Sequence, residues 1–182
     1  VKSLLLLCTF ASLMLPLRSA DFDLLITNAR IADGSGAPMI TGSVAVKGGR
    51  IVAVGDVKGT ATTQIDALGK VVAPGFIDVH THSENICKLP AAENFLRMGV
   101  TTIVTGNCGG SRTDVAQFFQ EIEEAKAAIH VATLVGHGVI REQAMGGRYR
   151  REPTPEDLEK MKGRVEQAMK DGAVGMSTGL IY

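Results

Sequence analysis

The sequence has few aromatic residues and no excess of charge, and both absences restrict what the protein binds. Aromatic residues make up 4% of the 182 residues and tryptophan is absent, which argues against an aromatic-rich recognition surface. The 19 Lys and Arg residues balance the 19 Asp and Glu residues, whereas proteins that bind nucleic acid usually carry a basic excess. We therefore expect a small-molecule partner and no nucleic acid.

Cysteine is also scarce, and the rest of the composition is that of an ordinary globular protein. Three cysteines cannot all pair with one another, which disfavours a disulfide scaffold. Hydrophobic residues make up 45% and charged residues 21%, which excludes a disordered chain. The 21 glycines suit many tight turns and close backbone contacts.

Residues 1–20 are predicted to be a secretory signal peptide. Lys2 precedes an apolar run over residues 4–15, Pro16 ends the run, and Ser19-Ala20 offers small residues for cleavage. The run is shorter than the ~20 apolar residues that span a bilayer. An uncleaved N-terminal anchor is the alternative. We expect export to the periplasm or the extracellular space, with membrane contact only during export.

Residues 21–73 are predicted to form a small β-sandwich. Residues 23–27, 43–47 and 50–54 have the composition of short strands, and no long helical period is present. Gly48-Gly49 separates the second strand from the third, and a two-glycine loop is typical of a β-hairpin.

Residues 74–182 alternate between predicted strands and helices. The strands are 76–82, 101–105, 130–135 and 173–178, and the helices are 90–98, one from Thr113 and one from Thr154 to about Asp171. The apolar faces of the last two helices are Val115, Phe118, Phe119, Ile122 and Ala125, then Leu158, Met161, Val165, Ala168 and Met169. Such alternation implies parallel strands covered by helices, in an α/β barrel or a doubly wound sheet.

His80, His82 and Cys108 are candidate metal ligands at predicted strand ends. Two imidazoles two residues apart on a strand share a face and can bind one divalent cation such as zinc. Cys108 follows the next strand among glycines, and a thiolate is a strong zinc ligand. Structural histidines, a nucleophilic cysteine or a buried structural cysteine are the alternatives.

Further candidates follow the third strand. His137 presents an imidazole that contacts substrate or a metal-bound group, or makes a structural hydrogen bond. Arg141, Arg148, Arg150 and Arg151 are expected in one loop, which either meets a carboxylate or is simply solvated.

Four segments resemble a known family. Residues 71–82 (VVAPGFIDVHTH) are similar to the opening strand of the amidohydrolase superfamily. Residues 99–109, 134–137 and 172–180 are similar, in the same order, to the D-aminoacylase family of N-acyl-D-amino-acid deacylases. The resemblance implies a β-sandwich beside a metal-dependent (β/α)₈ TIM-like barrel, of which residues 74–182 are the first half.

The resemblance also implies an activity and a zinc site. The reaction is hydrolysis of the amide of an N-acyl-D-amino acid to a carboxylate and a D-amino acid. Cys108 is then a ligand of a tightly held zinc, with His80 and His82 at a neighbouring, weaker position. His137 and Ser177 are candidates for contacting the substrate or supporting a ligand. Residues 176–178 offer no lysine for the bridging carbamate of dihydroorotases and hydantoinases, which favours a deacylase.

The resemblance further leads us to expect an inactive fragment. The family draws two more zinc-binding histidines and an aspartate general base from later strands, beyond Tyr182. Roughly 110 residues follow the sandwich, whereas a (β/α)₈ barrel typically takes ~250. Another amidohydrolase, such as a hydantoinase or dipeptidase, and a non-catalytic secreted module are the competing hypotheses.

Overall fold

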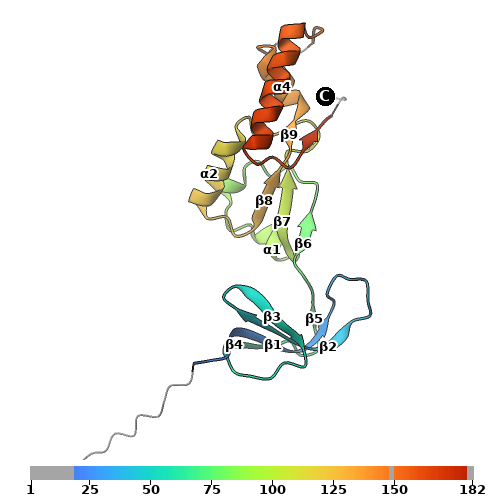
Figure 1. Cartoon of the computed structure of the whole chain (residues 1–182), viewed down its shortest axis with the longest axis vertical. Coiled ribbons are helices and arrows are strands. Elements are labelled where there is room, and N and C mark those ends of the chain that lie inside the picture. The colour runs from blue at the N-terminus through green and yellow to red at the C-terminus, as the bar shows by residue number, and fades with distance from the viewer. Residues whose placement is uncertain (1–18, 148–149, 180–182) are drawn as a thin grey trace, which may run out of the picture. The chain divides into compact units, whose positions relative to one another are not determined.

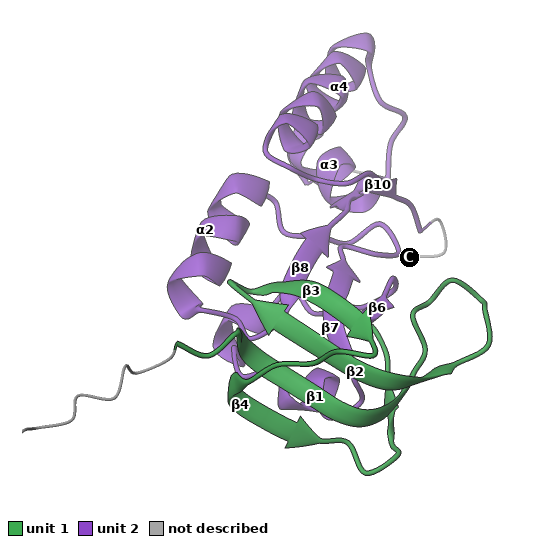
Figure 2. Cartoon of the chain, turned by 60° about the horizontal axis from the view of Figure 1, so that its bottom comes forward, with its two compact units in different colours: residues 1–74 green, residues 75–182 purple. Residues whose placement is uncertain are grey.

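The computed structural model describes residues 19–147 and 150–179, which belong to two compact units (Figure 1). Unit 1 comprises residues 1–74 and unit 2 residues 75–182 (Figure 2). The predicted signal peptide lies outside the described residues except for Ser19 and Ala20. Within the described ranges, no helix has both the length and the apolar character needed to cross a bilayer.

Unit 1 is built on one five-stranded sheet. Its strands are β1 (Phe22–Ile31), β2 (Ile40–Lys47), β3 (Arg50–Gly55), β4 (Ala61–Asp66) and β5 (Val71–Val72). The order is β3-β2-β1-β4, with β5 also paired to β1. The β1–β2 and β2–β3 pairs are antiparallel, while β4 and β5 run parallel to β1. The predicted strands are present, but all five described strands of this unit join one sheet instead of two packed sheets.

The predicted hairpin and the core of unit 1 follow from local chemistry. Gly48 and Gly49 have φ angles of 57° and 72°, the left-handed conformation that a tight hairpin turn requires and glycine adopts without strain. Ala29, Ile31, Val44 and Ala67 are buried together and form the apolar cluster of this unit.

Unit 2 combines short parallel strands with helices. Its elements are β6 (Phe76–Asp78), the 3₁₀ turn η1 (Ile86–Lys88), α1 (Glu93–Leu96), β7 (Val100–Thr105), α2 (Val115–Ala125), β8 (His130–Thr133), β9 (Val135–Gly136), α3 (His137–Ala144), α4 (Pro155–Lys170) and β10 (Met176–Ser177). Strands β6-β7-β8 form a parallel sheet, and β9 pairs in parallel with β10. The predicted α/β class with parallel strands is therefore confirmed (Figure 1).

Two helices show how well helical periodicity predicted burial. In α2, Asp114 caps the N-terminus by accepting from the Gln117 N–H, and Val115 and Phe118 are buried as predicted. In α4, Met161 and Ala168 are also buried. The same prediction is wrong for Leu158 and Met169 of α4, which are each 44% exposed.

Several predicted strands are shorter than expected, because their backbone groups find other partners. The strand predicted over 76–82 ends at Asp78, where the His80 N–H turns back to Asp78 Oδ1 at 3.1 Å. The strand predicted over 130–135 ends at Thr133, and β9 then pairs with β10 in a separate sheet. The strand predicted over 173–178 shortens to Met176–Ser177.

Other parts of the prediction for unit 2 need correction. The helix predicted over 90–98 is only α1, Glu93–Leu96. Helix α3 replaces part of the expected loop and begins at His137. Ile77 and Val79, in the strand predicted over 76–82, are 62% and 68% exposed, and β6 is the edge strand of its sheet within the described residues.

Candidate metal centre

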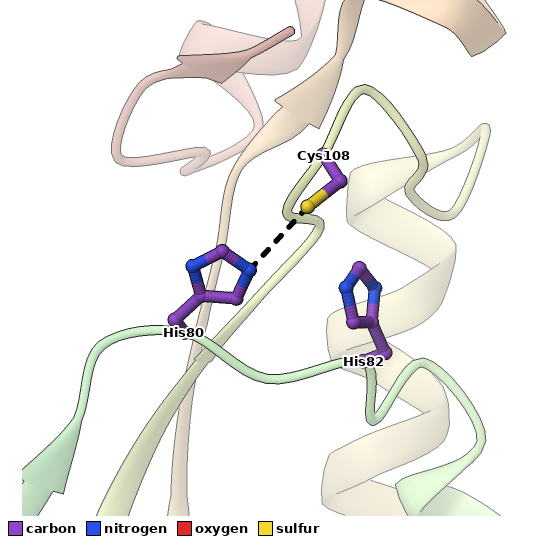
Figure 3. Close-up of side chains that lie close together, drawn as sticks. All are labelled: His80, His82 and Cys108. Atoms are coloured by element: carbon purple, nitrogen blue, oxygen red, sulfur yellow. Dashed lines mark hydrogen bonds between the residues drawn. The ribbon is translucent and has the colours of Figure 1, made fainter. Parts of the chain in front are cut away.

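The structure brings the three predicted metal ligands together at one end of the parallel sheet (Figure 3). One possible ligand atom from each of His80, His82 and Cys108 lies within 4.8 Å of the other two. The Cys108 Sγ lies 3.4 Å from His80 Nε2, and the two imidazole rings meet edge to face with centroids 5.7 Å apart. Three side chains from two separate turns therefore converge on one point.

The donor set fits a zinc ion. A thiolate sulfur about 2.3 Å and an imidazole nitrogen about 2.1 Å from one tetrahedral ion are separated by about 3.6 Å. The observed 3.4 Å between Cys108 Sγ and His80 Nε2 is close to that value. Both imidazoles are exposed, so small rotations of the rings can close the remaining separations. Thiolate and neutral imidazole are ligands that zinc accepts.

The two histidines approach Cys108 for a different reason from the one predicted. They were expected to share one face of a strand, but β6 ends at Asp78. Both lie in the bend over residues 79–82 that follows it, here called the histidine turn. Asp78 holds the His80 backbone, and the Thr81 N–H donates to the Val104 carbonyl at 3.0 Å. The histidine turn is thus tied to the end of β7, the strand that leads to Cys108.

Cys108 lies in a tight turn over residues 106–109 that glycines make possible, here called the cysteine turn. Its φ is 56°, and Gly106 and Gly109 on either side each have a φ of 81°. A left-handed conformation is uncommon for a residue with a Cβ, so the neighbouring structure must hold Cys108 in place. The turn directs the thiol toward the histidines (Figure 3).

Later parts of the chain supply that support. The Ser177 hydroxyl of β10 donates to the Gly106 carbonyl at 2.5 Å and accepts from the Gly109 N–H at 2.9 Å. The Gly138 N–H of α3 donates to the Gly109 carbonyl at 3.0 Å. Ser177 therefore bridges the two sides of the cysteine turn, and a direct contact between Ser177 and substrate stays a prediction.

A cleft of about 870 Å³ opens beside these residues. Its lining includes His82, Cys108, His137, Arg141, Glu142 and Arg150. This volume is typical of sites for small molecules. His137 lines the cleft from the first position of α3. The structure thus places this predicted imidazole at the same cleft as the candidate metal ligands.

The four arginines expected in one loop have different environments. Arg141 lies in α3 and donates to the Arg151 carbonyl at 2.6 Å, while Arg150 lines the cleft. Arg151 instead forms an ion pair of 2.6 Å with Asp157, which also closes the capping box at the start of α4. Arg148 lies outside the described residues.

Sequence reasoning missed a buried polar cluster below the cysteine turn. Thr105 is fully buried; its hydroxyl donates to Glu84 at 2.8 Å and accepts from the Ser83 N–H at 3.0 Å. Glu84 also accepts from the Gly106 N–H at 2.9 Å. The signal available in the sequence was a polar residue at the buried end of an apolar strand, next to the predicted ligand turn.

The second described cysteine is separate from the site. Cys87 lies in η1 and packs against a cluster of buried apolar residues that includes Ile86 and Phe118. Burial, and to a smaller extent the negative charge of Glu121, raises the pKa of the Cys87 thiol. A thiol that stays protonated is a poor nucleophile and a poor metal ligand.

Comparison with known proteins extends these observations. The model of a family described as "Amidohydrolase family" matches residues 63–182. A D-aminoacylase from Alcaligenes xylosoxydans xylosoxydans is 35% identical over 90% of this chain and 39% of its own length. An N-acyl-D-glutamate deacylase from the same organism is 34% identical over 88% and 38%. The chain therefore spans about two fifths of these relatives.

Solved structures give the same result. The N-acyl-D-glutamate deacylase of Bordetella bronchiseptica, complexed with zinc and a phosphonate mimic of the tetrahedral intermediate, matches with a TM-score of 0.84 and 36% identity. That match covers 88% of this chain and 39% of the other. A dihydroorotase, at 20% identity and a TM-score of 0.55, shares the fold alone. The resemblance to the D-aminoacylase family and the partial α/β barrel predicted from the sequence are both confirmed.

Proposed function

Because the chain belongs to the amidohydrolase family, we propose that it contributes a zinc-binding site to an N-acyl-D-amino-acid deacylase. The matched segment contains the candidate ligands His80, His82 and Cys108. Deacylases of this specificity are 34% and 35% identical to the chain over about nine tenths of its length. The activity is hydrolysis of a linear amide to a carboxylate and a free D-amino acid.

The single observation that carries this proposal is the convergence of one thiol and two imidazoles beside a cleft. His80 and His82 come from one turn, and Cys108 comes from another that starts 24 residues after His82. An N-acyl-D-glutamate deacylase that is 36% identical to the chain was solved in complex with zinc, which supports a zinc-binding role for this group.

Each residue then has a physical task. His80, His82 and Cys108 would hold the ion, which when bound would lower the pKa of a water molecule and polarise the scissile carbonyl. His137 offers a hydrogen-bonding imidazole across the cleft, and the positive charge of Arg150 suits the substrate carboxylate. None of the described lining residues is an aspartate, so the general base that the family implies stays a prediction.

The proposal is tested with a panel of ligands and the zinc-loaded chain. Binding of N-acetyl-D-amino acids, their L-enantiomers and a hydantoin is measured by calorimetry, and released amine is measured in parallel. The expected result is binding that prefers the D-enantiomers, requires zinc and is lost in Cys108→Ser. Equal binding of D- and L-compounds, or binding independent of zinc, contradicts it, and preference for the hydantoin supports another amidohydrolase.

Export is a separate part of the proposal. Residues 1–20 combine Lys2, an apolar run and small residues at Ser19-Ala20, as secretory signal peptides do. The chain is expressed in a bacterial host, and the N-terminus of the periplasmic protein is sequenced. A mature N-terminus near Asp21 is expected, whereas an intact Lys2 in the cytosolic fraction contradicts export.

A further inference from the structure

A buried amide joins the two turns that carry the candidate ligands. Asn107 stands immediately before Cys108 and is 7% exposed. Its Nδ2 donates to the Thr81 carbonyl at 3.2 Å and to the Val104 carbonyl at 3.1 Å. Thr81 lies between His80 and His82, so one side chain connects the residue before the thiol to the residue between the imidazoles.

The partners of this amide are themselves fixed. The Thr81 N–H and the Thr81 hydroxyl both donate to the Val104 carbonyl at 3.0 Å. Val104 belongs to β7, whose pairing with β8 includes the Val104–Ala132 register position. The amide therefore anchors the histidine turn and the cysteine turn to the same point of the sheet.

We propose that Asn107 is a positioning residue that sets the distance between the histidine pair and Cys108, and so controls the metal affinity. The inference rests on the proposed zinc site. The Asn107 amide nitrogen has two N–H groups, one for each of the two carbonyl oxygens that it contacts. An aspartate of the same shape instead presents oxygen to both carbonyls, which repels them and separates the turns.

A role in positioning makes a prediction that a merely structural role does not. A buried asparagine needed only for folding lowers stability without a specific effect on the metal. Groups that orient metal ligands typically change metal affinity by about 10–100-fold when they are mutated. Metal affinity and the spectrum of the metal–thiolate bond are therefore the decisive readouts.

The experiment titrates Co²⁺ into the 182-residue chain and follows the sulfur-to-cobalt charge-transfer absorption. Asn107→Asp is compared with wild type and with Asn28→Asp, the same substitution at an exposed position of unit 1. Asn28 Nδ2 donates to Asp66 Oδ1 at 3.0 Å, so this control also places an oxygen against an acceptor. We expect Asn107→Asp to weaken Co²⁺ binding about 10–100-fold and to lower the charge-transfer intensity, with Asn28→Asp unchanged.

The outcomes distinguish a failure of the proposed zinc site from a failure of the inference about Asn107. Wild-type affinity and spectrum in a folded Asn107→Asp chain overturn the inference, as does an equal loss in Asn28→Asp. Failure of the wild-type chain to bind Co²⁺ through sulfur refutes the proposed zinc site itself. If circular dichroism shows that Asn107→Asp is unfolded, Asn107→Ser decides, because its hydroxyl can serve only one carbonyl. An intermediate loss supports the role, and wild-type affinity overturns it.

Discussion

Gly136 lies against the cysteine turn so closely that a single methyl group is predicted to displace the turn. A Cβ at Gly136 would lie 2.5 Å from the carbonyl carbon of Gly109 and 2.8 Å from that of Gly110. Ordinary contact begins at 3.4 Å, so the turn must move by about 1 Å. The backbone of Gly136, with φ −82° and ψ 126°, suits alanine, so the effect is steric and not conformational.

The expected cost is that of overpacking, about 1–3 kcal/mol of unfolding free energy for Gly136→Ala. Because the displaced turn carries Cys108, zinc affinity should fall in the same variant. Gly163→Ala is the control, since a Cβ there would meet no atom within 4 Å apart from the neighbouring residues and backbone of its own helix, α4. There alanine should stabilise the chain by about 0.5–1 kcal/mol through its helix propensity.

Urea denaturation of the two variants and of wild type, with and without zinc, measures both effects. Opposite signs for Gly136→Ala and Gly163→Ala are the expected result, with weaker zinc stabilisation only in Gly136→Ala. A Gly136→Ala chain that is as stable as wild type and equally stabilised by zinc would refute the packing argument.

Three further predictions concern acid stability, thiol reactivity and the cysteine turn. The Arg151 guanidinium and the Thr154 groups at the start of α4 hold the pKa of Asp157 well below its usual range. The charged carboxylate therefore contributes stability above about pH 4, and this stability is lost as the pH falls toward the lowered pKa. The difference in melting temperature between wild type and Asp157→Asn should shrink toward pH 2, and a constant difference contradicts this. Iodoacetamide followed by peptide mapping should label Cys108 faster than Cys87, because the raised pKa of the Cys87 thiol lowers its reactivity. Zinc should protect only Cys108, and equal labelling of both cysteines contradicts the site. Ser177→Ala should weaken zinc binding because it removes both hydrogen bonds that bridge the cysteine turn, whereas Ser177→Thr should retain most of the affinity. Calorimetric titration with zinc measures the affinity of both variants. Unchanged affinity in Ser177→Ala contradicts the bridging role.

The ligand set could be predicted from sequence because each member occupies a recognisable local position. His80 and His82 follow an apolar strand segment, and Cys108 stands among glycines after the next one. Parallel strands end at the same edge of a sheet, so side chains after consecutive strands meet there. The prediction did not depend on how far each strand extends, which is why it survived the early end of β6 at Asp78.

The supporting contacts could not be predicted because they join residues far apart in the sequence. Ser177 is 71 residues from Gly106, and Asn107 is 26 residues from Thr81. Their hydroxyl and amide groups have many possible partners, and only the folded backbone selects one. The same limit applies to α3, which begins at His137 and whose Gly138 N–H contacts the distant Gly109 carbonyl.

Burial was least predictable for residues of short strands and for some residues on the predicted apolar faces of helices. Helical spacing placed Leu158 and Met169 on the apolar face of α4, yet both are partly exposed because few elements contact that side within the described residues. Ile77 and Val79, in the strand predicted over 76–82, are also exposed, and among the described strands β6 lies at the sheet edge. Periodicity identifies a face, while neighbouring elements decide whether it is covered.

X-ray absorption at the zinc edge tests the central claim, that Cys108 and the two histidines share in holding a metal ion. The zinc-loaded wild-type chain should show sulfur at about 2.3 Å and imidazole nitrogen at about 2.0–2.1 Å. In Cys108→Ser the sulfur shell should be absent. A wild-type spectrum with oxygen and nitrogen ligands alone, or a sulfur shell that persists in Cys108→Ser, would contradict the assignment of the site.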